Sequence, residues 1–164
     1  MGIPVFVNKT EYTGIETSFT NALRSKFAKS KVAQIVEVNR APAVIRGEIT
    51  DIQIIRGGAI DANESGDDFT DNGNSNDELP DNTILTTEYR VLVTVYVKMI
   101  GAEANRQLWD GQFRGERTYT APQARTARLN SANALYNDNA RRQIIAEISE
   151  DIMAEAHDRI SENF

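Results

Sequence analysis

The chain contains no cysteine, so it forms no disulfide bonds and performs no thiolate chemistry. Long hydrophobic runs are also missing, since no apolar stretch approaches the roughly 20 residues that a membrane-spanning helix needs. No basic helix or aromatic-rich basic ribbon is present, so the sequence does not predict nucleic-acid binding. P-loop and dinucleotide-binding motifs are absent as well. What remains is an ordinary globular composition, with 40% hydrophobic residues.

The formal net charge of −6 is unevenly distributed along the chain. Nine of the 24 acidic residues lie within residues 57–88, which contain no Lys or Arg, so all 18 basic residues lie elsewhere. This segment is rich in Gly, Asn, Asp and Ser and has almost no apolar content, a composition that cannot bury enough apolar surface to fold alone. We expect a long, mobile acidic loop over residues 57–87, carried by a mildly basic single domain spanning residues 1–164.

Residues 88–100, EYRVLVTVYVKMI, predict the central strand of the fold. Apolar side chains occupy every second position from Tyr89 to Met99, and a mixed set lies between them. An extended strand places these two sets on opposite faces, whereas a helix would scatter them around its axis. The many β-branched residues also favour a strand, with one dry face and one partly wet face.

Further strands are predicted at residues 3–7, 32–38, 43–55 and 106–120. In the segment 43–55 the apolar phase slips by one residue near Thr50, which is typical of a β-bulge. The sequence GAEAN at 101–105 indicates a tight hairpin between the central strand and the last strand.

A hairpin centred on Glu103 pairs apolar residues on the dry face and opposite charges on the wet face. The expected apolar pairs are Val97 with Trp109 and Val93 with Phe113, and the expected charged neighbours are Arg90 with Glu116 and, diagonally, Lys98 with Asp110. In this register we expect Trp109 to pack in the core and not to contact a partner.

Two amphipathic helices complete the predicted fold. The first follows Gly14 and repeats apolar residues at spacings of three and four, namely Ile15, Phe19, Ala22, Leu23 and Phe27. The second closes the chain after a linker at 121–131, and its apolar stripe is Ile145, Ile148, Ile152, Ala156 and Ile160. The element order predicts an α+β two-layer sandwich, in which a four- to five-stranded, mainly antiparallel sheet carries both helices on one face.

The acidic loop contains a weak match to a calcium site. Asp61, Asn63, Ser65 and Gly66 fit positions 1, 3, 5 and 6 of the twelve-residue EF-hand loop. Position 12 is Asn72 in place of the bidentate Glu, and no helical pattern flanks the segment. We therefore expect a solvated acidic loop, and the sequence calls for no metal or cofactor.

The sequence gives no support for an enzyme. Its single histidine, His157, lies in the acidic helix that closes the chain, and we expect it at the surface with no nucleophile beside it. A Ser/His pair would need this residue because cysteine is absent, and no G-x-S-x-G nucleophile elbow is present.

A candidate binding surface lies on the wet face of the predicted sheet. Arg90, Tyr96, Lys98 and Arg114 share one strand parity, and Arg106 shares it at the hairpin edge. A row of such cations can form charge-assisted hydrogen bonds with phosphate groups. The alternative is a solvated sheet face, on which these cations simply pair with neighbouring carboxylates.

The opening IPVFVNKT, followed by GIE and an amphipathic helix, resembles the start of the LptE family of lipopolysaccharide-assembly lipoproteins. AVIRGEI in the third strand, EYRVLVTVYV in the fourth and LW in the fifth agree with that family in the same order. The resemblance covers nearly the whole chain and depends on the order and spacing of the motifs.

The resemblance implies a non-enzymatic subunit at the periplasmic side of the outer membrane. It would bind the LptD barrel, help that barrel assemble and contact lipopolysaccharide through the wet sheet face. Its lipid anchor would lie outside this chain, and the opening MGIPVFVN is compatible both with a natural start and with removal of a leader.

Two alternatives remain at this point. Periplasmic interaction modules of the TolB amino-terminal and penicillin-binding-protein-activator type also begin with a strand ending near Phe-x-Asn and an amphipathic helix. Such a module would bind a peptidoglycan enzyme or a secretion component and no glycolipid. A domain with an unrelated partner is the second alternative.

Deleting residues 60–82 should leave the stability of the protein nearly unchanged. Few apolar contacts can originate in this segment, and the entropy of loop closure depends only weakly on loop length. Thermal unfolding of the deletion variant tests this expectation. A large fall in Tm would show that the acidic loop is packed or holds a metal.

Overall fold

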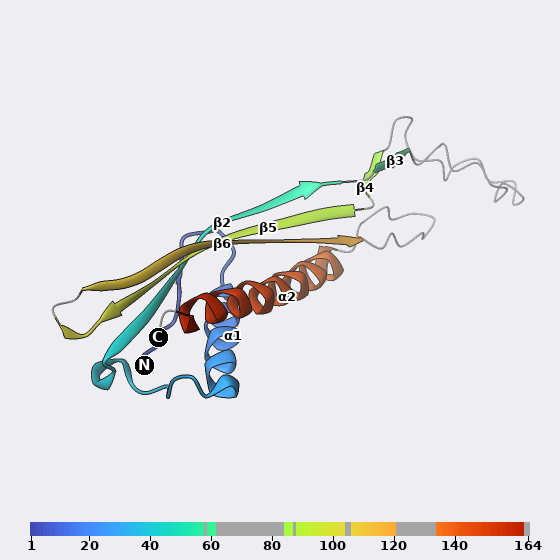
Figure 1. The fold of residues 1–164 in the computed structure, drawn as a ribbon. Coiled ribbons are helices and arrows are strands. Elements are labelled where there is room, and N and C mark those ends of the chain that lie inside the picture. Colours follow the sequence, from blue (N-terminus) through green and yellow to red (C-terminus); the bar gives the residue numbers. More distant parts are fainter. Residues whose placement is uncertain (58, 62–83, 87, 104–105, 121–133, 163–164) are drawn as a thin grey trace, which may run out of the picture.

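The computed structural model describes residues 1–57, 59–61, 84–86, 88–103, 106–120 and 134–162. Its elements in chain order are β1 (Val7–Asn8), α1 (Ile15–Ser30), the 3-10 helix η1 (Val38–Arg40), β2 (Ala43–Arg56), β3 (Ala59–Asp61), β4 (Ile84–Thr86), β5 (Glu88–Gly101), β6 (Gln107–Thr120) and α2 (Ala134–Ser161). Figure 1 shows the long strands as one layer and the two long helices as a second layer on one side of it. The predicted two-layer α+β fold is confirmed.

The main sheet has the strand order β1-β2-β5-β6. β1 pairs with β2 in parallel, and the other two pairings are antiparallel. The ladder between β2 and β5 shifts its register between Ile49 and Asp51, so the predicted β-bulge is confirmed. The bulge keeps apolar residues on the same face along the whole of β2.

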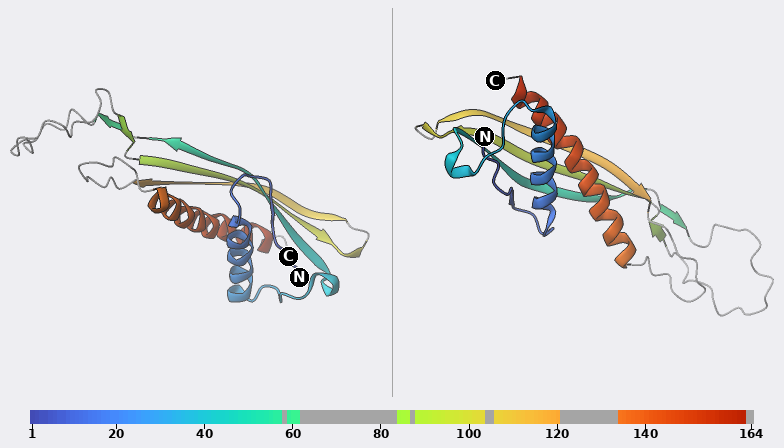
Figure 2. Two further views of the ribbon diagram at one scale, coloured as in Figure 1. Left: turned by 180° about the vertical axis from the view of Figure 1, so that it is seen from behind. Right: turned by 90° about the horizontal axis from the view of Figure 1, so that it is seen from below.

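The inner face of the sheet, which carries the odd-numbered residues of β5, is packed against both helices. Val91, Val93, Val95 and Val97 are at most 1% exposed, as the period-two pattern predicted. The predicted stripes of both helices cover this face, and their large residues that are at most 2% exposed include Phe19, Leu23 and Phe27 of α1 and Ile148, Ile152 and Ile160 of α2. The outer face carries the even-numbered residues of β5 and their cross-strand partners. Both long helices, α1 and α2, lie on the opposite side of the sheet (Figures 1 and 2).

Close backbone contact joins α2 to β6. A Cβ atom placed on Gly115 would lie 2.6 Å from Ile148 Cγ2 and 2.9 Å from Ile152 Cδ1, so the helix approaches the strand only because this side chain is absent. Both isoleucines are at most 2% exposed and have no free space into which to move.

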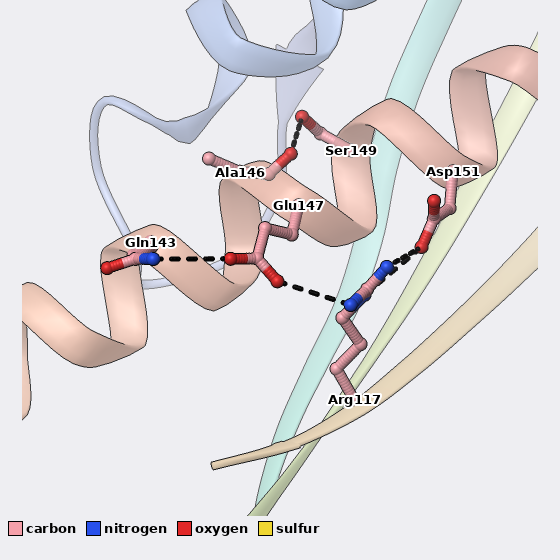
Figure 3. A network of polar contacts seen from close by, with 6 residues as sticks. All are labelled: Arg117, Gln143, Ala146, Glu147, Ser149 and Asp151. Atoms are coloured by element: carbon pink, nitrogen blue, oxygen red, sulfur yellow. Dashed lines mark hydrogen bonds and ion pairs between the residues drawn. The ribbon is translucent and has the colours of Figure 1, made fainter.

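An ion-pair network on the edge of the same interface adds a polar connection. Arg117 of β6 lies 2.7 Å from Asp151 Oδ2 and 3.2 Å from Glu147 Oε2 on α2 (Figure 3). The hydrogen bond to Asp151 raises the pKa of Arg117. These side chains are about half exposed, so solvent screens both pairs and their contribution to stability is small. The buried Ser149 hydroxyl donates to the carbonyl of Ala146, which satisfies it within the helix.

The predicted strand at 32–38 is wrong. The Met1 ammonium donates to the carbonyl of Gln34 (2.7 Å), and the amide of Val36 donates to the carbonyl of Met1 (3.0 Å), so these backbone groups bond to the first residue of the chain. Ala33 and Ile35 are the partly buried residues of this segment, whereas Val32 is 48% exposed. The residues that pack on the core therefore have the opposite parity to the predicted apolar face, on which Val38 is also exposed.

The predicted strand at 3–7 is only partly correct. Regular pairing is confined to β1, although Gly2 also bridges to Val44. Ile3 and Phe6 are buried, and the Phe6 ring occupies the space over Gly47 that a side chain would fill. A spacing of three between buried residues is incompatible with a regular strand.

The acidic segment begins and ends differently from the prediction. β3 and β4 form a separate two-stranded sheet, in a register that continues that of β2 and β5, so strand pairing extends into the segment that we predicted as a loop. The predicted mobility of the remainder concerns residues 62–83, which lie outside the described residues.

The predicted register of the hairpin between β5 and β6 is wrong by two residues. Trp109 faces Met99, and Phe113 faces Val95, with an irregularity between Met99 and Ile100. A shift of two leaves every side chain on its predicted face. Trp109 therefore lies on the inner face as expected, partly buried, with its ring centroid 6.1 Å from that of Phe113.

Gly115→Ala should lower the free energy of unfolding by about 1–3 kcal/mol, because the new methyl group overlaps two buried isoleucine side chains. Gly111→Ala is the matched control on the same strand and face. Its methyl group would meet the Trp109 ring, which is partly exposed and can move, so the expected change is below about 1 kcal/mol. Urea unfolding measures both values, and equal losses would contradict the packing described here.

Candidate functional site on the outer face of the sheet

The structure brings most of the predicted binding residues together on the outer face. Arg90, Tyr96 and Lys98 lie on β5, and Arg114 lies on the adjacent β6, opposite Thr94. Arg106 directly precedes β6 and is exposed. The strand parity that suggested this grouping is correct for Arg90, Tyr96, Lys98 and Arg114. It is wrong for Arg106, because the irregularity between Met99 and Ile100 pairs Gln107 with Ile100 and reverses the parity at the start of β6.

One cation of this group is already paired. Arg90 Nε lies 3.1 Å from Glu116 Oε1, so the predicted contact between these residues is confirmed. It is a diagonal contact, because Arg90 directly faces Thr118 in the observed register. Both side chains are about half exposed, so the pair adds at most about 1 kcal/mol to stability but reduces the local positive charge.

Lys98 lies directly opposite Asp110, so the predicted diagonal placement is wrong. The carboxylate of Asp110 nevertheless has other partners: the Tyr96 hydroxyl donates to Oδ2 (2.7 Å), and Gln107 Nε2 donates to Oδ1 (2.8 Å). The hydrogen bond to Asp110 raises the pKa of the Tyr96 hydroxyl above its ordinary value. The donors to the Asp110 carboxylate are therefore the neutral side chains of Tyr96 and Gln107.

Three of the predicted cations are available for a ligand. Among the described residues, no ion pair includes the side chains of Lys98, Arg106 or Arg114. Carboxylates are interspersed with them, so the face is a mixed surface and does not form a continuous basic patch. Its chemistry suits discrete phosphate groups better than a polyanion.

Sequence reasoning missed Arg46, an exposed cation on the same face. It lies on β2 directly opposite Lys98. The strand parity of residues 43–55 before the bulge contained the signal, because Arg46 alternates with the buried Ile45 and Gly47. Only the register between β2 and β5 places it beside Lys98.

The prediction of a surface histidine is wrong. His157 is 9% exposed, and its Nε2 lies 2.7 Å from the hydroxyl of Ser30, while its Nδ1 lies 2.9 Å from Asp158 Oδ1. The imidazole also meets the Phe27 ring edge-on, with centroids 4.6 Å apart. Acid-rich neighbours in the sequence hid this contact, which joins residues 127 positions apart.

The Ser30–His157–Asp158 contacts follow the order of a catalytic triad, but the surroundings differ. Ser30 ends α1, where helix carbonyl groups point outward and disfavour a developing oxyanion. The Lys31 amide donates to the carbonyl of Phe27, which directs this nearby donor away from a substrate. The geometry supports a polar contact between the ends of two helices.

The calcium-loop prediction is not tested by the structure. Asp61 ends β3, and Asn63, Ser65, Gly66 and Asn72 lie outside the described residues. Within the described ranges, no group of three or more His, Asp or Glu side chains is placed to hold a metal ion. None of the helices in this part of the chain combines the length and apolar character needed to cross a membrane.

Solved structures with a similar fold cover nearly the entire chain. The hypothetical protein CT253 from Chlamydia trachomatis is 8% identical, with a TM-score of 0.57, and the match covers 99% of this chain and 95% of that chain. Rare lipoprotein B from Shewanella oneidensis is 13% identical, with a TM-score of 0.49, over 99% of this chain and 95% of that chain. At these identities the first likeness shows a shared fold, and the second carries no further argument.

Comparison of the sequence with known proteins gives the family. No curated protein matches the chain significantly. The family model described as "LptE: Lipopolysaccharide-assembly" matches residues 1–160. This match confirms the resemblance suggested by the strand motifs, and the chain belongs to the LptE family of lipopolysaccharide-assembly proteins.

Proposed function

We propose that this protein is a non-enzymatic subunit of an outer-membrane lipopolysaccharide-assembly complex, in which it binds an LptD-type barrel and contacts lipopolysaccharide. The observation that carries this proposal is the family match over residues 1–160. The fold supports it, because both long helices cover one sheet face and leave the other open to a larger partner (Figure 2).

The outer face supplies the chemistry for the glycolipid contact. Lipid A carries phosphates on a sugar backbone, and Arg114 can offer two parallel N–H donors to one phosphate. Lys98 adds a point charge on the neighbouring strand. Tyr96 completes the proposed surface, Arg106 lies at its hairpin edge, and Arg90 contributes least because Glu116 already neutralises it.

The proposed location is the periplasmic side of the outer membrane, reached through a lipid anchor outside this chain. The absence of an enzymatic role is part of the proposal. It is supported by the position of Ser30 at the carbonyl end of α1, which does not favour stabilisation of an oxyanion beside His157.

Replacing Arg90, Lys98 and Arg114 together by Glu should weaken lipopolysaccharide binding by at least about tenfold without unfolding the protein, because each exposed cation near an anionic lipid surface contributes about 1 kcal/mol. Pull-down with lipopolysaccharide at several salt concentrations measures the effect, and binding should fall as salt rises. Unchanged binding by a folded triple variant would remove the outer face from the proposal.

A matched pair of single variants sharpens the test. Arg114→Gln removes an arginine that forms no ion pair among the described residues, and it should weaken binding about fivefold. Arg90→Gln removes another exposed arginine of the same face, which is paired with Glu116, and it should change binding less than about twofold. Recovery of a peptidoglycan synthase and no barrel in pull-downs of the wild-type protein would instead support the TolB-like alternative.

A further inference from the structure

Two like charges face each other on the outer face near the β5–β6 hairpin. Arg46 of β2 is the direct cross-strand partner of Lys98 of β5. The Cβ atoms of such partners lie about 4.5–5.5 Å apart, and like charges in these positions destabilise a sheet. No hydrogen bond or ion pair within the described ranges involves either side chain. The fold itself therefore gains nothing from this juxtaposition.

The two carboxylates nearest to this pair already have other partners. Glu48, two residues along β2 from Arg46, lies 2.5 Å from Lys9 Nζ. Asp110, on the far side of Lys98, accepts hydrogen bonds through both of its oxygens. An anion from outside the protein could therefore bind between Arg46 and Lys98 without displacing an existing ion pair.

Apolar side chains lie beside the two cations, toward the hairpin. Val44 and Ile100 are the next cross-strand pair on this face, and both are only partly buried. Leu108, at the irregularity where β6 begins, is 44% exposed but lies against the side of Gly101 that has the parity of the inner face, so it is not part of this group. The amide of Ala102 donates to the carbonyl of Pro42 (2.8 Å), which ties the hairpin to the start of β2.

We propose that this end of the sheet docks on an anionic phospholipid surface. Arg46 and Lys98 bind phosphate oxygens of the headgroups, and the Val44–Ile100 pair contacts the first methylene groups below them. Cations that flank partly exposed apolar side chains are the combination by which soluble elements bind the membrane interface. This docking is separate from the proposed contact with lipopolysaccharide and barrel, because it requires Arg46 and does not require Arg114.

The position of the sole tryptophan provides a local readout. Trp109 is partly exposed on the inner side of the same hairpin. Its emission reports on the hairpin end alone, because the chain contains no second tryptophan. Wild-type protein is titrated with vesicles of phosphatidylcholine alone and with vesicles that also contain phosphatidylglycerol, with co-sedimentation as a second measurement.

We expect binding and a blue shift of the Trp109 emission only with the anionic vesicles. Arg46→Gln and Lys98→Gln should each weaken binding about fivefold, and the double variant about 25-fold. Ile100→Thr, which keeps a β-branched residue in the strand, should weaken binding with both cations intact. Arg90→Gln is the control, since it removes a paired cation from the same face, and it should bind like wild type.

Three outcomes would overturn the docking proposal. The first is wild-type binding by a folded double variant, and the second is equal binding to neutral and anionic vesicles. The third is release of the vesicles by inorganic phosphate at the concentration of the lipid phosphate, which would show a simple anion site without a lipid contact. Each of these results leaves the lipopolysaccharide test of Arg114→Gln unaffected, so the two proposals fail independently.

Discussion

The packing of two helical apolar stripes on a single face of the sheet is the constraint from which the rest of the structure follows. Every odd-numbered residue of β5 from Val91 to Met99 is buried, so the centre of this face is used by the core. Gly115 allows α2 to pack closely on β6, and the Phe19–Leu23–Phe27 stripe packs α1 beside it. The hydrophobic effect thereby assigns one face to folding and leaves the opposite face for contacts with other molecules.

The outer face is organised by its charges, and their pairing separates structural from available groups. Arg90 and Lys9 each neutralise a glutamate, and Tyr96 with Gln107 holds the carboxylate of Asp110. The remaining cations have no such role in the described part of the fold. A family whose members assemble lipopolysaccharide handles a phosphorylated amphiphile, and a rigid sheet with discrete, unpaired cations is suited to that chemistry.

The sequence predicted the features that depend on periodicity and missed those that depend on tertiary contacts. The alternation of apolar and polar residues predicted which side chains of β5 and β6 face the core. The change of phase in the segment 43–55 predicted the bulge in β2, because a shift of one residue moves every following side chain to the opposite face. The hairpin register was wrong by two residues, since a shift of two preserves the same alternation. The segment 32–38 alternates like a strand, yet its backbone groups bond to Met1.

The candidate site shows the same division. Parity alone grouped Arg90, Lys98 and Arg114 on one face, whereas the proximity of Arg46 to Lys98 could be seen only from the β2–β5 register.

Photocrosslinking can show whether the outer face of the sheet is the surface that contacts other molecules. A photoreactive residue is placed at Gln112 on the outer face or at Glu150 on the exposed side of α2. The account predicts crosslinks to an outer-membrane barrel or to lipopolysaccharide from position 112 and none from position 150. Crosslinks from position 150 alone would contradict it.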